Sequence, residues 1–121
     1  MEWHVVFHEA FEGEFTDLPE PVQDELLAHA ALLATFGPHL KRPRADTLKG
    51  SRHANMKELR FDAEDGVWRV AFAFDPDRKG ILLVAGDKSG QSEKRFYRQL
   101  IAKADERFAD HLSGLSKKGD Q

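Results

Sequence analysis

The chain has 121 residues with a formal net charge of −3, and 40% of its residues are hydrophobic. This length and apolar content predict a single domain with its own core and argue against a second domain. Cysteine is absent, which excludes disulfides, thiolate zinc sites and cysteine nucleophiles. No apolar run approaches membrane-spanning length and the N-terminal stretch is too acidic for a leader peptide, so we expect a cytoplasmic protein.

Charge is distributed unevenly along the chain. The first 36 residues include eight acidic residues and no Lys or Arg, so all 18 cations follow them. The segment Lys41–Arg60 alone carries seven of these cations against Asp46 and Glu58. The distribution indicates a basic face suited to a polyanion and an acidic face opposite. Two solvated faces of a small protein would give the same counts, so charge alone leaves both interpretations open.

The first third of the chain predicts one strand and two helices. Trp3–Phe7 is a β-branched and aromatic run typical of a strand. From Glu9 to Asp17 the apolar residues recur at helical spacing, which indicates a short helix with one apolar stripe. A second, antiparallel helix is expected after the corner Leu18–Pro21, and it would end at the stop signal Gly37-Pro38.

The middle of the chain predicts a long loop and then a meander of three antiparallel strands. Pro38–Asn55 lacks periodicity and is rich in basic and turn-forming residues, so we expect a partly mobile loop there. The three strands are predicted at Lys57–Asp62, Val67–Asp75 and Ile81–Asp87, where turn signals separate the runs.

The end of the chain predicts a third helix and completes the expected fold. Apolar residues follow helical spacing from Glu93 to Leu112, whereas Ser113–Gln121 is small and polar and is expected to fray. Together the elements predict one small α+β domain over residues 1–121. It would contain a twisted, mainly antiparallel sheet of about four strands, packed against two N-terminal helices and the C-terminal helix.

Side-chain alternation within the meander predicts a cationic site. Successive residues of a strand point to opposite faces, so Arg69 shares a face with alanines that are too small to fill the space around it. Antiparallel pairing would bring Arg60 onto the same exposed face, with Lys57 and Lys88 near its margins. Such a cluster suits a polyanion. The alternative is that each arginine pairs with a nearby carboxylate such as Glu58.

Three segments carry a resemblance to a known family, namely LKGSRHANMKELRF, WRVAFAFDP and ILLVAGDKSG, in this order. From Trp3 to about Leu112 the chain resembles the RelE/ParE toxin superfamily, and in particular its phage-derived HigB-like branch. Members of that superfamily are the toxin halves of bacterial type II toxin–antitoxin pairs. Many of them cleave mRNA on the ribosome, a ParE branch acts on DNA gyrase, and an antitoxin silences each toxin.

The resemblance implies an mRNA endonuclease that inhibits translation and needs no metal or other cofactor. RNA supplies its own nucleophile, the 2′-hydroxyl, so cleavage needs in-line positioning, charge stabilisation at phosphorus and proton transfer. Guanidinium groups match phosphate oxygens, and a lysine among other cations can exchange a proton. The residues expected to act in catalysis are Arg60, Arg69, Lys57 and Lys88. The residues expected to bind RNA are Lys49, Arg52, His53, Lys94 and Tyr97.

Two of these residues have simpler alternatives. His53 is a candidate general acid or base, but a lone loop histidine is more often only solvated. Tyr97 borders the apolar stripe of the final helix, so packing at the core edge is the alternative to stacking on a base. The remaining histidines and carboxylates show no metal-ligand spacing, and no metal site is expected.

The resemblance also implies partners. These are mRNA, with or without the ribosome, and a cognate antitoxin of the helix-turn-helix HigA type. Many ribosome-dependent members are strongly basic, whereas this chain is slightly acidic. This difference keeps open a ParE-like toxin that binds DNA gyrase and has no nuclease site, and also an inactive interaction module.

Overall fold

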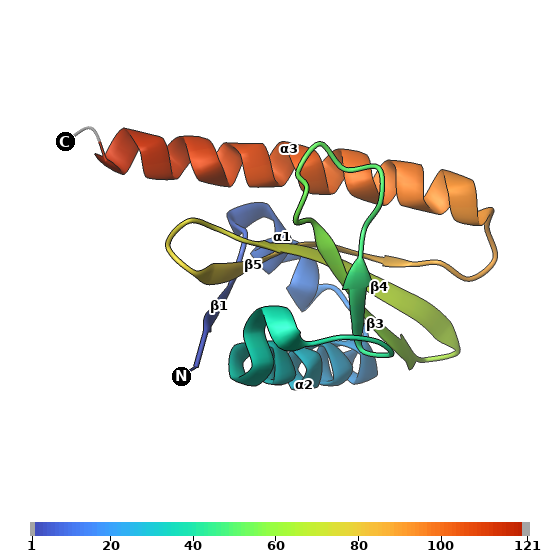
Figure 1. Cartoon of the computed structure of the whole chain (residues 1–121). Helices are drawn as coiled ribbons and strands as arrows, with labels where there is room; N and C mark the ends of the chain where they lie inside the picture. The colour runs from blue at the N-terminus through green and yellow to red at the C-terminus, as the bar shows by residue number, and fades with distance from the viewer. Residues whose placement is uncertain (1, 120–121) are drawn as a thin grey trace.

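The computed structural model describes the backbone of residues 2–119 and the side chains of residues 2–116. It has the predicted α+β architecture, with a sheet between helices that cover its two faces (Figure 1). The elements in chain order are β1 (His4–Phe7), α1 (Glu9–Thr16), α2 (Glu20–Phe36), the 3-10 helix η1 (Gly37–His39), β2 (Ala45–Thr47), β3 (Lys57–Ala63), β4 (Gly66–Phe74), β5 (Lys79–Asp87) and α3 (Glu93–Gly119).

The sheet is mixed and has five strands in the order β1-β5-β4-β3-β2, one more than the four or so expected. Strands β3, β4 and β5 form the predicted antiparallel meander, and β1 pairs with β5 in parallel. The additional strand, β2, lies inside the segment Pro38–Asn55, which the sequence analysis assigns to a loop. Three residues are too few to show a periodic pattern, and β2 is a strand because it pairs with the edge of β3.

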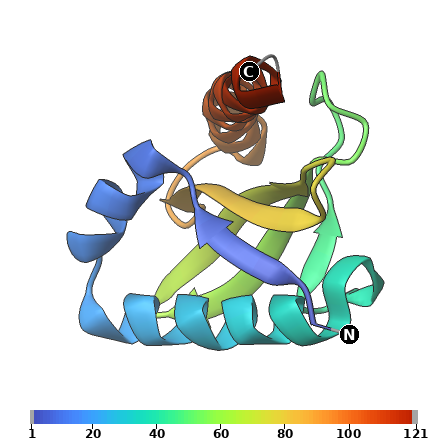
Figure 2. The ribbon, with the colours of Figure 1, turned by 90° about the vertical axis from the view of Figure 1, so that its left-hand side faces the viewer.

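Each face of the sheet has its own core. Helices α1 and α2 cover one face, where Phe11, Leu26 and Leu33 pack with Leu59 and Phe72. This arrangement is visible along the sheet edge, with α2 below the sheet and α3 above it (Figure 2). The predicted apolar stripe of α1 is present, because Phe11 and Phe15 pack in this core and the Phe11 ring stacks on that of Phe7 in β1 at a centroid distance of 5.4 Å.

Helix α3 covers the second face and is longer than predicted. Phe96, Leu100 and Phe108 bury the side chains of β4 and β5 beneath them. The helix continues to Gly119, beyond the predicted end at Leu112, and residues 120–121 lie outside the described part of the chain. That the segment Ser113–Gln121 frays stays a prediction. The C-terminal half of the helix also contacts the sheet side of the protein, since His111 hydrogen-bonds to Asp75 and Leu112 packs against the core of this face.

An ion pair joins α3 to α1 across the edge of the sheet. The Arg107 guanidinium donates to the Glu14 carboxylate through Nη1, at 2.9 Å, and through Nη2. The hydrogen bond from Arg107 lowers the pKa of Glu14 and outweighs the opposing effect of partial burial. Arg107 Nη1 also donates to the carbonyl of Leu83 at 2.8 Å, so one side chain holds α1, α3 and β5 together.

Gly37 is the position where backbone conformation and space both require glycine. It ends α2 with a φ of +54°, and the Trp3 indole lies where a Cβ would project. We expect Gly37→Ala to lower the free energy of unfolding by about 1–3 kcal/mol, through steric overlap and left-handed strain. Urea denaturation measures this change. Gly13→Ala is the control, since Gly13 lies in α1 with open space around it and alanine should stabilise that helix by about 0.5–1 kcal/mol. Equal stability of the two variants would contradict the conclusion that position 37 requires glycine.

Asp75 ties the β4–β5 turn to α3. Its carboxylate accepts a hydrogen bond from the Lys79 amide at 2.9 Å and another from His111 Nε2 at 2.7 Å. Burial alone would raise the pKa of Asp75, but these hydrogen bonds outweigh burial and hold the pKa below its ordinary value of 3.8. A lowered pKa adds stability that is present above the unfolded-state pKa and is lost as the pH falls through the folded-state pKa.

We therefore expect Asp75→Asn to be less stable than the wild type at neutral pH, with a difference that shrinks as the pH falls below 3.8. The measurement is the free energy of unfolding of both proteins over a series of pH values. Asp77→Asn, at an exposed position of the same turn, should show no such dependence. A difference for Asp75→Asn that stays constant from neutral to acidic pH would refute the expectation.

Candidate functional site

Arg60 of β3 and Arg69 of β4 are direct cross-strand partners, as the sequence analysis expects. The face on which they lie is covered, not exposed, because α3 crosses it. Arg69 is only 6% exposed, and the alanines that follow it on its face are buried against α3. Their small size makes room for the helix rather than for an open groove. Arg60 lies at the margin of this cover, and 24% of its side chain is exposed.

Glu58 is the centre of the arginine pair. It is 3% exposed, and its Oε2 accepts a hydrogen bond from Arg60 Nη1 at 2.8 Å. Its Oε1 accepts from the Tyr97 hydroxyl at 2.9 Å and lies 3.9 Å from Arg69 Nε. One buried carboxylate thus compensates two guanidinium groups and holds both in place. We call Glu58, Arg60, Arg69 and Tyr97 the Glu58 cluster.

Tyr97 closes the Glu58 cluster from α3. Its hydroxyl accepts a hydrogen bond from Arg69 Nε at 3.3 Å and donates to Glu58. Burial raises the pKa of the Tyr97 hydroxyl, and the hydrogen bond to Glu58 raises it further against the smaller opposing effect of Arg69. The phenol therefore stays protonated at neutral pH. Lys88 borders the cluster, with Nζ 5.9 Å from the centre of the Tyr97 ring and 3.0 Å from Glu93 Oε1.

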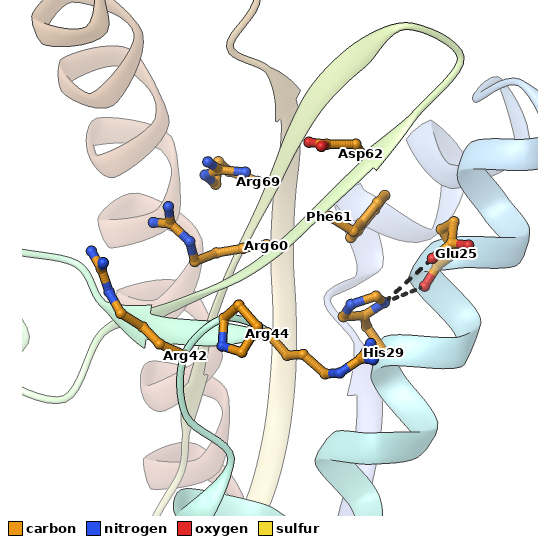
Figure 3. A pocket seen from close by; sticks show the side chains of 9 residues that line it. Glu25, His29, Arg42, Arg44, Arg60, Phe61, Asp62 and Arg69 are labelled. Atoms are coloured by element: carbon orange, nitrogen blue, oxygen red, sulfur yellow. Dashed lines mark hydrogen bonds and ion pairs between the residues drawn. The ribbon is translucent and has the colours of Figure 1, made fainter.

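A pocket of about 740 Å³ opens beside the Glu58 cluster. It lies along the part of β3 that follows Leu59, where the short strand β2 no longer pairs with β3. Arg42, Arg60 and Arg69 lie along one side of it with Asp62 near Arg69, whereas Glu25, His29 and Phe61 line the other side, toward which the Arg44 side chain extends (Figure 3). The arginines are Arg42, Arg44, Arg60 and Arg69. We call this the arginine pocket. Four guanidinium groups line this cavity against the carboxylates of Glu25 and Asp62, and this excess of positive charge favours phosphate groups.

Lys57 is not where the sequence analysis expects it. Strand alternation places it on the opposite face from Arg60, together with the core side chains of β3. Its Nζ lies 3.5 Å from the Pro38 carbonyl, in a different hollow next to η1. The prediction that Lys57 stands at the margin of the Arg60–Arg69 cluster is therefore wrong.

The loop between β2 and β3 is fastened to α3, away from the Glu58 cluster. Asp105 accepts hydrogen bonds from the Ser51 hydroxyl and, at 3.0 Å, from the Arg52 amide. The His53 ring packs edge-on against Phe108 at a centroid distance of 4.9 Å, so it is packed rather than solvated. Lys49 in this loop and Lys94 in the first turn of α3 are both exposed. The structure thus places the predicted RNA-binding residues other than Tyr97 outside the Glu58 cluster.

Sequence reasoning missed Glu58, Arg42 and Arg44 as parts of the site. Glu58 was considered only as a competing partner for Arg60, although its position on the same strand face was a usable signal. Arg42 and Arg44 belong to the basic segment that the charge distribution singles out. The backbone brings them to the pocket, since the carbonyl of Arg44 accepts a hydrogen bond from the Arg60 amide at 2.9 Å.

No group of three or more His, Asp or Glu side chains among the described residues is arranged to hold a metal ion. None of the described helices is both long enough and apolar enough to cross a membrane.

Residues 13–109 match the sequence profile of the family described as phage-derived protein Gp49-like (DUF891). The chain belongs to the Gp49-like family. It is similar to two proteins of Mycobacterium tuberculosis (strain ATCC 25618 / H37Rv) that are named as candidate toxins. HigB2 is 45% identical over 89 residues, which is 73% of the Gp49-like chain but only 44% of HigB2. HigB3 is 46% identical over 82 residues, which is 68% of the chain and 69% of HigB3.

The fold of the Gp49-like chain is that of a solved toxin structure. A mutant of E. coli RelE in the free state superposes with a TM-score of 0.58, covering 85% of this chain and 97% of RelE at 13% identity. At that identity the superposition establishes the fold alone. The family match and the fold agree with the resemblance found in the sequence.

Proposed function

We propose that the chain is the toxin component of a type II toxin–antitoxin pair and inhibits translation by cleaving mRNA. The observation that carries this proposal is the Glu58 cluster, where two guanidinium groups from paired positions of neighbouring strands both line the arginine pocket. The similarity to HigB2 and HigB3 and the RelE-like fold support the same function.

The Glu58 cluster supplies what cleavage by an internal nucleophile needs. The 2′-oxygen attacks the adjacent phosphorus in line, loses its proton, and the bond to the 5′-oxygen breaks as that oxygen gains a proton. Negative charge grows on the non-bridging phosphate oxygens during attack. Arg60, which is partly exposed, would bind these oxygens, and Arg69 would add fixed positive charge behind it.

Glu58 and Tyr97 would act as positioning residues for the two arginines. Without a substrate, Glu58 compensates both guanidinium charges, and Tyr97 restrains Arg69 through its hydroxyl. Held in this way, the donors need little reorganisation when a phosphate arrives. Lys88, at the border of the cluster, would add positive charge or take part in proton transfer.

We further propose a cognate antitoxin as the partner that keeps the toxin inactive. An acidic segment of the antitoxin would suit the arginine pocket, because four arginines line it and a carboxylate can bind a guanidinium group as a phosphate does. The substrate would be mRNA in the cytoplasm, on the ribosome or free of it.

Induced expression in a bacterial host tests the proposal. Growth would be followed while the 5′ ends of transcripts are mapped before and after induction. Growth arrest together with new ends inside mRNA supports the nuclease. Arrest with broken DNA and unchanged transcripts would instead favour a gyrase-directed toxin, and normal growth would favour an interaction module.

A further inference from the structure

Two arginines of the arginine pocket, Arg42 and Arg44, lie outside the Glu58 cluster and belong to the segment before β2. Both residues are exposed, and 71% of the Arg42 side chain is accessible to solvent. The backbone that carries them is held in a turn, since the amides of Arg44 and Ala45 donate to the carbonyl of Lys41 at 3.0 and 3.1 Å. Two long cationic side chains thus line the pocket from a backbone that is fixed by hydrogen bonds.

The charges of these two arginines are available to a ligand. Arg42 Nε donates to Asp46 Oδ2 at 2.8 Å, and this hydrogen bond lowers the pKa of Asp46. Because Arg42 is largely exposed, the pair contributes little free energy, and Arg42 can exchange the carboxylate for a phosphate. Within residues 2–116 the other three arginines of the pocket each pair with a carboxylate, whereas none pairs with Arg44. The Arg44 side chain extends toward His29 (Figure 3).

Arg44 is also a direct backbone neighbour of Arg60. The Arg60 amide donates to the Arg44 carbonyl at 2.9 Å, as between paired strands, so the two backbones run roughly 5 Å apart. Their side chains reach different sides of one cavity of about 740 Å³, which is large enough for one nucleotide (Figure 3). A strand of RNA whose cleaved phosphate contacts Arg60 can therefore place its next phosphate within reach of Arg44.

We infer that Arg42 and Arg44 bind the phosphate next to the cleaved one, so that the arginine pocket holds a single strand of RNA by two successive phosphates. This inference rests on the proposed nuclease function, since it extends the substrate site of the same reaction. Guanidinium groups bind phosphate oxygens whatever the base, so this subsite positions the strand without reading its sequence. Because Glu25 and Asp62 also line the pocket, the affinity comes from direct contacts with the guanidinium groups rather than from net charge alone.

The test measures the binding of a short RNA that cannot be cleaved. The probe is a trinucleotide with two phosphates and methylated 2′-oxygens, and a second probe carries a neutral methylphosphonate in place of one phosphate. NMR titration of the purified wild-type chain should show that the second probe binds on the order of tenfold more weakly. In Arg42→Ala/Arg44→Ala only the contact through Arg60 remains, and one phosphate satisfies it. The two probes should then bind with about equal affinity.

Arg95→Ala/Arg98→Ala is the matched control, because it removes two exposed arginines of α3 that lie outside the pocket lining. It should keep the wild-type difference between the probes. Equal affinity of the two probes for the wild type, or an undiminished difference in Arg42→Ala/Arg44→Ala, would overturn the inference and leave the pocket to the antitoxin. The titration involves no cleavage, so its result is separate from success or failure of the nuclease assignment.

Cleavage kinetics distinguish this subsite from the site of reaction. On a defined mRNA, Arg42→Ala/Arg44→Ala should raise KM on the order of tenfold and leave kcat nearly unchanged, because the contact is the same before and during the reaction. A fall in kcat with an unchanged KM would place the two arginines at the reacting phosphate and overturn the inference.

Discussion

Arg60→Ala is expected to reduce the rate of mRNA cleavage on the order of 10²–10³-fold, which corresponds to about 3–4 kcal/mol of lost transition-state stabilisation. The reason is that Arg60 is the partly exposed member of the guanidinium pair and lines the pocket, so a phosphate can reach it whereas Arg69 is buried. The measurement is the cleavage rate of a defined mRNA, with the fold checked by circular dichroism.

The fold should survive this change, because Glu58 keeps its hydrogen bond from Tyr97 and its proximity to Arg69. Arg60→Lys keeps the charge but loses the planar fork, so we expect an intermediate rate. Arg98→Ala, which removes an exposed cation of α3, is the control and should cleave as the wild type does. A folded Arg60→Ala variant with the wild-type rate would remove Arg60 from the mechanism.

Glu58→Ala is expected to cost about 3–5 kcal/mol of folding stability, the largest loss among the variants considered. The substitution removes the carboxylate that compensates Arg69, whose guanidinium would stay buried without an opposite charge beside it. It also leaves the Tyr97 hydroxyl without its acceptor. Urea denaturation measures the loss, and the same protein should show reduced cleavage because both arginines lose their restraint.

Two further variants separate the effect of the charge at position 58 from that of losing any glutamate. Glu58→Gln keeps an acceptor for Tyr97 but not the negative charge, so its stability should lie between those of Glu58→Ala and the wild type. Glu106→Ala changes an exposed glutamate of α3 and should stay within about 0.5 kcal/mol of the wild type. A loss below about 1 kcal/mol for Glu58→Ala would show that the buried carboxylate does not hold the cluster together.

Helices and strands with a regular spacing of apolar residues were predictable from the sequence. Elements that form only through contact with another part of the chain were not. Alternation in β4 and helical spacing in α2 and α3 reflect which side chains a single element buries, so the local pattern is enough. Strand β2 exists because its three residues pair with β3, and the last turns of α3 follow a polar segment. Neither feature has a local signal.

In the functional site, too, some features follow from the local sequence and others only from the tertiary structure. The pairing of Arg60 with Arg69 follows from two neighbouring strands joined by a short turn, so the sequence could indicate it. The burial of Arg69 depends on the path of α3, and Tyr97 reaches Glu58 across 39 positions of sequence. The arginine pocket combines α2, the segment before β2 and the meander, and only the tertiary structure shows that these parts adjoin.

The most direct test of the nuclease assignment is primer extension on a defined mRNA in a bacterial cell-free translation extract, to which the purified wild-type chain or Arg60→Ala is added. The extract holds ribosomes and free mRNA together, so either mode of cleavage would be detected. The Glu58 cluster predicts new 5′ ends inside the mRNA with the wild type and intact mRNA with Arg60→Ala. Intact mRNA with a wild-type chain that nevertheless arrests growth in cells would contradict cleavage as the function.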